Sequence, residues 1–204
     1  RVIANSQMVK REAEEYYGYP ADRIDVVPNG IPLVDFHPDL EARSLRRKIM
    51  QLRDDQIAVL FVGSGWERKG LRYATEAVRS LGKKFRLFVA GRGRGPKVYG
   101  RAVQHLGAVR DLPSLYAATD IFLLPTLYDP FSNACLEALA TGMPVVTTRD
   151  NRFSEIIEQR VHGSILDAPS NIAQICEALR YWSDANRRES ARPAILECAG
   201  HFDI

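Results

Sequence analysis

Two carboxylates flank a predicted strand-to-helix turn in the second half of the chain. Asp129 follows Ile121–Leu124, an apolar run that is too short for a helix and suited to a buried strand. Glu137 lies eight residues further on, in a helix predicted to begin near Ser132 and to end at Gly142. Because the free amides at a helix N-terminus bind phosphate, a diphosphate at this turn would have a carboxylate on each side. Such a site suits a nucleotide sugar, which carries hydroxyl groups at both ends.

The elements around this turn predict a parallel sheet. A second β-branched run, Val145–Thr148, follows the helix, so the order is strand, helix, strand. Ligands of open α/β sheets bind outside the carboxyl ends of the strands. We therefore expect the backbone amides of Phe131, Ser132 and Asn133 to face the diphosphate. The whole pattern predicts a doubly wound α/β domain with about six parallel strands.

A glycine-rich loop, Gly63–Gly70, is predicted to supply positive charge to the same site. It follows Ile57–Val62, a continuous apolar run typical of a buried parallel strand, and it contains Arg68 and Lys69. Glycine lets the backbone approach phosphate closely, and the two basic side chains add mobile positive charge. An ordinary solvent-exposed turn is the alternative, and the phosphate interpretation is favoured because this loop also leaves a strand at its carboxyl end.

Two further patterns do not indicate a site. Gly91–Pro96 resembles a dinucleotide fingerprint but has proline at the position of the last glycine and no suitable acidic residue downstream, so a flexible loop before the next helix is expected. His105 lies far from any partner motif, and a structural place at a strand edge is expected. Asp111 is predicted to start a helix that covers Leu112–Ala118.

Composition places the chain among ordinary globular proteins. Its 204 residues suffice for one domain with a core, and a net charge of +3 requires neither a nucleic acid nor an acidic partner. No apolar run approaches the ~20 residues of a membrane-spanning helix. Basic residues do crowd Arg43–Arg53; a solvated helix face is the favoured interpretation, and a surface for anionic lipid head groups is the alternative.

The three cysteines lie far apart on predicted helices. Cys135, Cys176 and Cys198 show no metal-ligand spacing and no disulfide framework. They are expected to be small core residues in a reducing compartment.

The two loops together resemble a known family. Acid-x7-Glu followed by Ala-Leu-Ala-Thr-Gly-Met-Pro-Val-Val, and Gly-Ser-x-x-x-Arg-Lys-Gly before it, are similar to the signatures of family 4 (group 1) retaining glycosyltransferases of the GT-B fold. Nearly the whole chain resembles their carboxy-terminal, donor-binding domain, with the closest loop match among lipopolysaccharide-core glucosyltransferases. Two departures are visible: Asp129 replaces the usual glutamate, and Ser64 replaces an arginine that many members carry.

The resemblance implies a role for each matching residue. Glu137 would accept hydrogen bonds from the ribose, Asp129 would hold the donor sugar, and Arg68 with Lys69 would neutralise the leaving diphosphate, so these four form the predicted catalytic set. The predicted donor-binding set comprises Gly63, Ser64, Phe131, Ser132, Asn133 and, as weaker candidates beside the nucleotide base, Val109 and Arg110.

The resemblance also implies partners and organisation. The donor would be a nucleotide sugar, expected to be UDP-linked; the acceptor would be a glycan or a lipid-linked glycan; and neither a metal ion nor a cofactor would be needed. Residues 1–24 would end a preceding amino-terminal domain and residues 25–204 would form the donor domain, inactive alone because the reaction occurs between the two domains. A cytoplasmic location is expected, with peripheral contact with anionic membrane.

Two other functions stay open. The chain could bind a nucleotide sugar without activity of its own, or belong to a nucleotide-sugar epimerase of the same fold.

Overall fold

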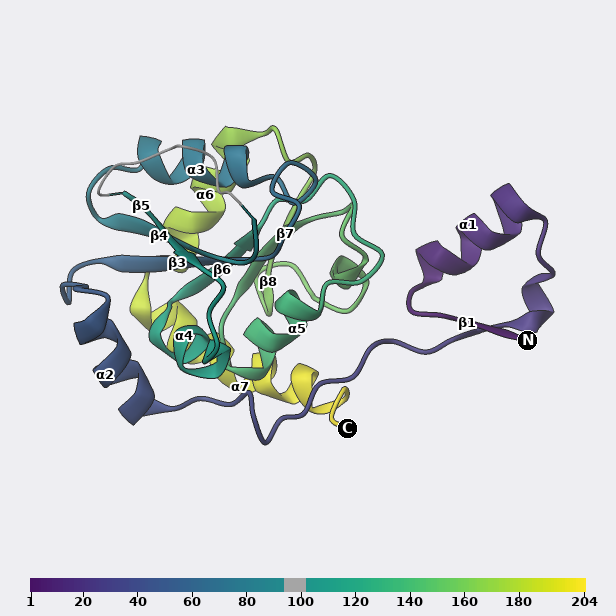
Figure 1. Cartoon of the computed structure of the whole chain (residues 1–204), viewed down its shortest axis with the longest axis horizontal. Coiled ribbons are helices and arrows are strands. Elements are labelled where there is room, and N and C mark those ends of the chain that lie inside the picture. The colour runs from purple at the N-terminus through teal and green to yellow at the C-terminus, as the bar shows by residue number, and fades with distance from the viewer. Residues whose placement is uncertain (94–101) are drawn as a thin grey trace.

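The computed structural model describes residues 1–93 and 102–204, and its centre is one parallel sheet. Six strands pair in the order β5-β4-β3-β6-β7-β8, and every pairing is parallel. The α-helices lie on both faces of this sheet (Figure 1). The predicted doubly wound α/β fold is therefore confirmed. The strands are β3 (Ile57–Val62), β4 (Phe85–Ala90), β5 (Val103–Gly107), β6 (Ile121–Leu124), β7 (Val145–Thr148) and β8 (Gly163–Leu166).

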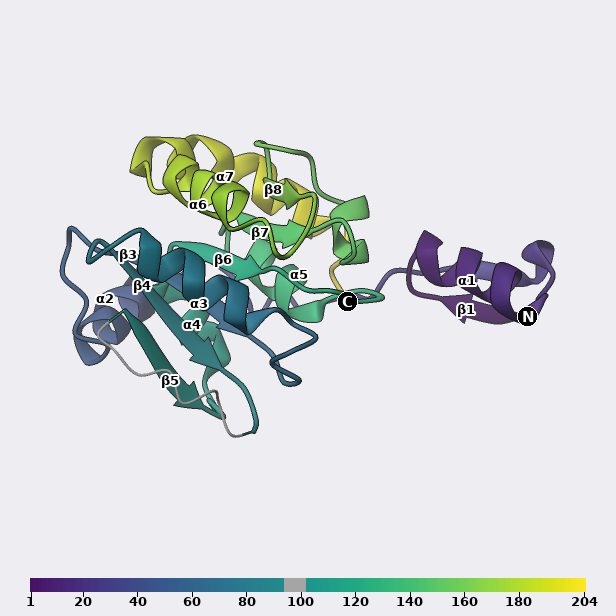
Figure 2. The same cartoon turned by 90° about the horizontal axis from the view of Figure 1, so that it is seen from above.

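Strands β3 and β6, in the middle of the sheet, are apolar throughout because both faces of the sheet are covered. Every residue of β3, β6 and β7 is buried. Helices α3 and α6 pack together on one face, while the pairs α2 with α4 and α5 with α7 cover the other (Figures 1 and 2). The helices are α2 (Leu40–Ile49), α3 (Leu71–Ser80), α4 (Leu112–Ala118), α5 (Asn133–Ala140), α6 (Ile172–Trp182) and α7 (Ala185–Gly200).

The first 26 residues form a small unit of their own. Strands β1 (Val2–Ala4) and β2 (Ile24–Val26) pair in parallel, and α1 (Gln7–Tyr17) with a short 3-10 turn, η1 (Ala21–Arg23), connects them. Figure 1 shows this amino-terminal unit at one end of the molecule, joined to the rest by a single connecting segment. The predicted boundary between residues 24 and 25 falls inside β2; because β2 hydrogen-bonds to β1, the unit extends through Val26. That the unit belongs to a preceding domain stays a prediction.

Hydrogen bonds fasten the segment that follows the amino-terminal unit to the main body. The Asn29 side-chain amide donates to the Asn133 side chain at 2.6 Å. The Ile31 amide donates to the carbonyl of Phe202 at 2.8 Å, so the end of the chain covers this connection. A Cβ atom at Gly30 would lie 2.2 Å from Ile204, which explains glycine at this crossing.

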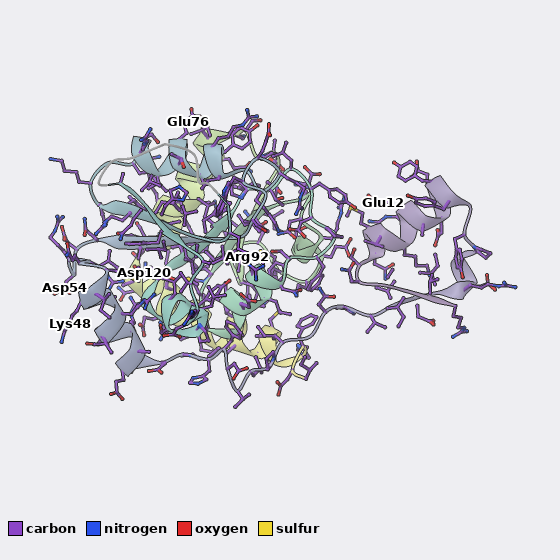
Figure 3. The ribbon with its side chains drawn as sticks, viewed as in Figure 1. Glu12, Lys48, Asp54, Glu76, Arg92 and Asp120 are labelled. Carbon is purple, nitrogen blue, oxygen red and sulfur yellow. The ribbon has the colours of Figure 1, made fainter. Side chains whose placement is uncertain are left out.

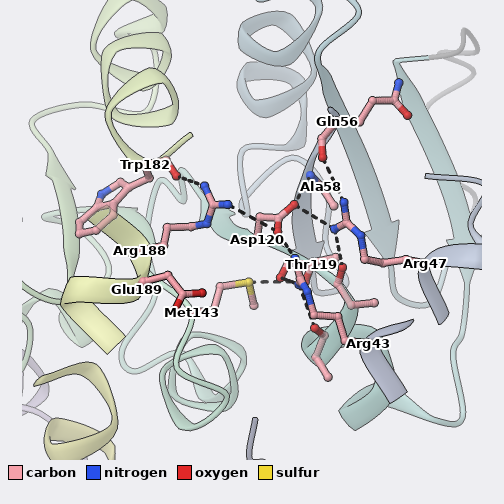
Figure 4. A network of polar contacts seen from close by, with 12 residues as sticks. Arg43, Arg47, Gln56, Ala58, Thr119, Asp120, Met143, Trp182, Arg188 and Glu189 are labelled. Atoms are coloured by element: carbon pink, nitrogen blue, oxygen red, sulfur yellow. Dashed lines mark hydrogen bonds and ion pairs between the residues drawn. The ribbon is translucent and has the colours of Figure 1, made fainter. Parts of the chain in front are cut away.

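Helix α2 corrects the expectation of a solvated basic face. Arg43 and Arg47 point inward to Asp120, a buried carboxylate that precedes β6 (Figure 4). The outer side of the helix instead exposes Leu45 and Ile49, each more than 60% accessible. Arginines one turn apart thus attach α2 to the body, because their guanidinium groups satisfy a carboxylate that would otherwise be buried without a counter-charge.

The segment after β7 forms a single 3-10 turn, η2 (Arg152–Glu155), which contains Ser154 and Glu155. Asn151 is the cap, because its side-chain oxygen accepts from the amide of Phe153 at 3.2 Å. Part of the glycine-rich Gly91–Pro96 segment, from residue 94, lies outside the described residues, and so does the stretch up to residue 101 in which a helix was expected to follow.

Candidate donor-binding site

The loop after β3 and the loop after β6 are pressed together at the carboxyl edge of the sheet. Gly70 adopts a φ of +75°, and a Cβ atom there would lie 1.9 Å from the carbonyl oxygen of Pro125. The carbonyl of Arg68 accepts from the Leu127 amide at 2.8 Å and from the Thr126 hydroxyl at 2.9 Å. Only glycine at position 70 allows the backbone to approach the Pro125 carbonyl so closely, so Gly70 fixes the distance between the two loops.

The basic residues of the first loop meet the acid of the second. Lys69 donates to the Asp129 carboxylate, and the Arg68 guanidinium lies 3.9 Å from the same oxygen. Arg68 also donates to the carbonyl of Tyr128 at 2.6 Å. The Asp129 side chain is only 6% exposed and that of Lys69 only 12%, so the pair is largely removed from water. Lys69 is therefore not the mobile cation that the sequence suggested, because Asp129 holds it in place.

A network of buried polar side chains holds the second loop, and sequence reasoning missed it. The Thr148 hydroxyl donates to the carbonyl of Thr126 at 2.6 Å, and the Asn151 amide donates to the Thr147 hydroxyl at 2.9 Å. All four of these residues are fully buried. Because an unpaired polar group is costly inside a protein, this set specifies one loop conformation. A polar Thr-Thr pair ending an apolar strand was the available signal.

The N-terminus of α5 lies beside this loop. Helix α5 starts at Asn133 with Ser132 as its N-cap residue. The Ser132 hydroxyl is buried and has no hydrogen-bond partner among the described residues. Phe131 turns its ring inward against Phe153, with ring centroids 6.0 Å apart. The first-turn amides are thus available at the carboxyl edge of the sheet, as expected, with a polar hydroxyl beside them.

Glu137 lies one helical turn further along α5 and contacts a tyrosine of α4. Burial raises the pKa of the Glu137 carboxyl above its ordinary value of 4.5, and a hydrogen bond with Tyr116 opposes this shift. Tyr116 is itself buried and donates its hydroxyl to the carbonyl of Ala134 at 3.1 Å. Among the ion pairs of the described residues, none involves Glu137. Tyr116 is a supporting residue that the sequence analysis did not identify; its polar tip on an otherwise apolar helix face was the only signal.

The remaining predicted residues lie along the same edge of the sheet. Gly63 directly follows β3 and donates its amide to the carbonyl of Ala90 at 3.0 Å, while Ser64 is exposed. Val109 is half-buried and Arg110 exposed in the connection between β5 and α4, whose N-cap is Asp111, as predicted.

His105 has a structural environment. Its ring packs edge-on against Trp66 with centroids 5.9 Å apart, and burial lowers its pKa. Trp66 in turn packs against Phe61 of β3. The expected structural role of His105 agrees with this position at the edge strand β5.

The cysteines occupy the helices α5, α6 and α7 and are free thiols. Cys135 is fully buried beneath the site, and burial raises the pKa of its thiol to about 12, so it is not a nucleophile. Within residues 1–93 and 102–204, no group of three or more histidine, cysteine, aspartate or glutamate side chains could hold a metal ion. In the same part of the chain, none of the helices combines the length and apolarity that crossing a membrane requires.

The site thus joins one ion pair, one helix N-terminus and one half-buried carboxylate at the carboxyl ends of parallel strands. A comparison with family models is decisive. The model described as glycosyl transferases group 1 matches residues 56–184, which is more than half of the chain. The chain belongs to this family. A second model, glycosyltransferase family 4, matches residues 1–34.

Known proteins of the family support this placement. The chain is 32% identical over 178 residues to an uncharacterized glycosyltransferase of Methanocaldococcus jannaschii, covering 80% of this chain and 46% of that protein. It is 27% identical over 209 residues to the lipopolysaccharide glucosyltransferase WaaG of Escherichia coli, covering 93% of this chain and 54% of that protein. The chain therefore spans about half the length of the curated relatives that it matches.

Solved structures confirm the fold. The carboxy-terminal domain of a group 1 glycosyl transferase from Francisella tularensis superposes with a TM-score of 0.72 at 20% identity, covering 86% of this chain and all of that chain. Anabaena HepE, solved in complex with UDP-glucose, superposes with a TM-score of 0.85 at 21% identity, covering 98% of this chain and 59% of that chain. The fold is thus that of the carboxy-terminal domain of GT-B group 1 glycosyl transferases, and the predicted resemblance is confirmed.

Proposed function

We propose that this chain is the donor-binding part of a retaining hexosyltransferase that transfers a sugar from a UDP-linked donor to a glycan or lipid-linked acceptor. The observation that carries the proposal is the buried Lys69–Asp129 ion pair, placed beside the N-terminus of α5 at the carboxyl edge of the sheet. Parallel α/β sheets bind their ligands at this edge. Membership of the family and the UDP-glucose complex of HepE favour a nucleotide sugar as that ligand.

The residue roles follow from the charges around the site. The free amides at the start of α5 and the half-exposed Arg68 guanidinium stabilise the diphosphate as negative charge develops on it during bond cleavage. Lys69 neutralises Asp129, so a sugar hydroxyl that approaches this carboxylate meets an acceptor already held in position. Glu137 accepts from the ribose hydroxyls. Gly63, Ser64, Val109 and Arg110 complete the proposed donor site.

Calorimetric titration of the chain with UDP, GDP, ADP and UDP-glucose tests the donor site. Replacing Glu137 by Ala removes two proposed ribose hydrogen bonds and should weaken UDP binding by roughly 1.5–3 kcal/mol. Glu158→Ala, an exposed glutamate outside the site, is the matched control and should leave binding unchanged. If the folded chain binds none of the four ligands, or if Glu137→Ala binds UDP as well as the unchanged chain does, the assignment is wrong.

Metal independence is part of the proposal. The half-exposed Arg68 guanidinium and a helix N-terminus supply the positive charge that a divalent ion supplies elsewhere. Transfer by the whole enzyme should therefore persist in the presence of a chelator, and loss of activity that added Mg²⁺ restores would contradict this. Product analysis of the same reaction distinguishes sugar transfer from epimerisation, which is the alternative chemistry for this fold. If neither product is detected, the chain would be assigned as a nucleotide-sugar-binding module without activity of its own.

We also propose a cytoplasmic protein that contacts anionic membrane from the inner face. The outer side of α2 supports this partner, because Leu45 and Ile49 are exposed there beside Lys48, which Figure 3 places at the far end of the molecule from α1. Exposed aliphatic and cationic side chains on one helix face favour an anionic lipid surface. Lys48→Glu should weaken sedimentation with phosphatidylglycerol vesicles, whereas Arg23→Glu, the same change of charge on η1, should not. Equal binding by both variants would remove this part of the proposal.

A further inference from the structure

The tyrosine next to Asp129 connects the donor site to the amino-terminal unit. The Tyr128 hydroxyl donates to the carboxylate of Glu12 on α1 at 2.9 Å. Figure 3 shows Glu12 on the part of α1 nearest the main body. The two residues are 116 positions apart in the chain, so this hydrogen bond is a contact between separate units. It lies outside the roles proposed for the donor-binding residues above.

The backbone of Tyr128 lies inside the proposed catalytic set. Its carbonyl accepts from Arg68 at 2.6 Å, and a second hydrogen bond joins it to the Thr126 hydroxyl at 3.1 Å. Tyr128, whose side chain contacts α1, therefore also provides the carbonyl that orients Arg68, one of the two proposed catalytic cations. It directly precedes Asp129, which pairs with Lys69, the other cation.

A second contact brings α1 to the neighbouring loop. The Gln7 amide donates to Glu155 of η2 at 3.1 Å, and the Arg11 guanidinium lies 3.6 Å from the same carboxylate. The Arg152 amide on this turn donates to the carbonyl of Asp129 at 3.0 Å. Helix α1 thus contacts both segments that flank Asp129.

We propose that Tyr128 is a positioning residue whose hydrogen bond to Glu12 couples docking of the amino-terminal unit to the conformation of the donor-binding loop. When α1 is docked, the Tyr128 ring is fixed at its outer end, and its carbonyl holds Arg68 toward the diphosphate position. When α1 moves away, the ring loses its anchor and the loop loses one of its constraints. The inference rests on the proposed function, because it concerns the reaction at the same site.

The reasoning predicts a separation between donor binding and turnover. Tyr128→Phe keeps the backbone carbonyl and the ring but deletes the hydroxyl. A hydrogen bond to a charged group at a partly exposed position corresponds to about a fivefold to tenfold effect. In the whole enzyme, kcat should fall by about this factor while the KM for the donor changes less than twofold. In the 204-residue chain, small-angle X-ray scattering should show a larger radius of gyration for Tyr128→Phe.

A double-mutant cycle identifies the partner. Glu12→Ala should reduce kcat as much as Tyr128→Phe does, and the double variant should show no further loss, because both changes remove one interaction. Glu12→Gln keeps an acceptor oxygen and should restore much of kcat. Tyr17→Phe and Glu15→Ala, made on exposed positions of the same helix, are the matched controls and should change neither kcat nor the radius of gyration.

The failure of this inference is distinguishable from failure of the proposed function. If Glu137→Ala abolishes donor binding but Tyr128→Phe leaves kcat unchanged, the donor site stands and the coupling is wrong. Additive losses in the double variant would also overturn it. If Glu137→Ala has no effect on donor binding, the proposed function itself fails. A lower melting temperature for Tyr128→Phe with an unchanged kcat would indicate a merely structural hydrogen bond.

Discussion

Replacing Asp120 by Asn should destabilise the fold more than any comparable change at the surface. Asp120 is 5% exposed and accepts from Arg43 at 2.5 Å, from Arg47 at 3.1 Å and from the Ala58 amide at 2.8 Å. Arg188 adds positive charge 3.9 Å away (Figure 4). The carboxylate therefore joins α2, α7 and the start of β3 at the amino edge of the sheet.

The size of the effect follows from what asparagine keeps. It retains one oxygen, which can accept from one of these donors, but it has no charge and turns an NH2 group toward the others. Removing one partner of a buried ion pair costs about 3–5 kcal/mol. Because Arg43 and Arg47 keep partial access to water, at 32% and 16% side-chain exposure, we expect the lower end, about 3 kcal/mol.

The pH dependence has a defined sign. Burial alone would raise the pKa of Asp120, but Arg43, Arg47 and the Ala58 amide together hold it below its ordinary value of 3.8. A carboxyl group with a lowered folded-state pKa stabilises the protein above its unfolded-state pKa, and this stabilisation is lost as the pH falls through the folded-state value. The difference between the wild type and Asp120→Asn should therefore be constant near neutral pH and shrink below about pH 3.8.

Urea unfolding followed by circular dichroism measures this difference without adding salt. Asp55→Asn is the matched control, because Asp55 also accepts two hydrogen bonds from an arginine, Arg53, at 2.8 and 3.0 Å, but at the surface. The control should be indistinguishable from the wild type. A loss of less than 1 kcal/mol for Asp120→Asn, or an equal loss in both variants, would refute the argument that burial makes this network important.

Two further predictions concern the donor site. Gly70→Ala should destabilise the chain by about 1–3 kcal/mol or more and weaken UDP binding, because Gly70 has a left-handed backbone and the new Cβ would meet Pro125. Gly82→Ala is the control in both measurements, because Gly82 is also left-handed but has open space around it. UDP affinity should fall on acidification through the raised pKa of Glu137, above pH 4.5, because the protonated carboxyl accepts ribose hydrogen bonds poorly. Glu137→Gln should bind UDP more weakly than the wild type at pH values where Glu137 is ionised, and it should remove that pH dependence; an unchanged pH profile in this variant would assign the titration to another group.

The sequence predicts the sheet well because a strand that is buried on both faces appears in the sequence as a continuous apolar run. The runs Ile57–Val62 and Ile121–Leu124 correspond to strands β3 and β6 without a shift, and the predicted helix Leu112–Ala118 corresponds to α4. Apolar runs and caps depend on neighbours in the chain, and both are therefore visible locally. The glycine-rich loop after β3 and the loop after β6 both lie at the expected edge, because that edge follows from the direction of the strands.

Long-range polar pairing could not be predicted in this way. Arg43 and Arg47 on a ten-residue helix look solvated until a distant aspartate is brought beneath them. Lys69 was expected to be mobile for the same reason: nothing in the sequence of Gly63–Gly70 indicates that the lysine pairs with Asp129 and is buried with it. A charged residue shows its partner only when the fold brings the two together, so burial of charge is the property least accessible from one sequence.

The buried ion pairs of Asp120 and of Asp129 lie at opposite edges of the sheet and have different roles. At the amino edge, Asp120 is surrounded by three guanidinium groups and a backbone amide, so its acceptor capacity is taken up and α2 is fastened in place. At the carboxyl edge, Asp129 has one close cation, Lys69, and a second at 3.9 Å, so its carboxylate retains capacity for a further donor. A carboxylate with unused acceptor capacity at the carboxyl edge is what a sugar hydroxyl requires. The same chemical group is therefore structural at one end of β6 and suited to a ligand at the other, and the difference lies in how many donors the surrounding elements bring to it.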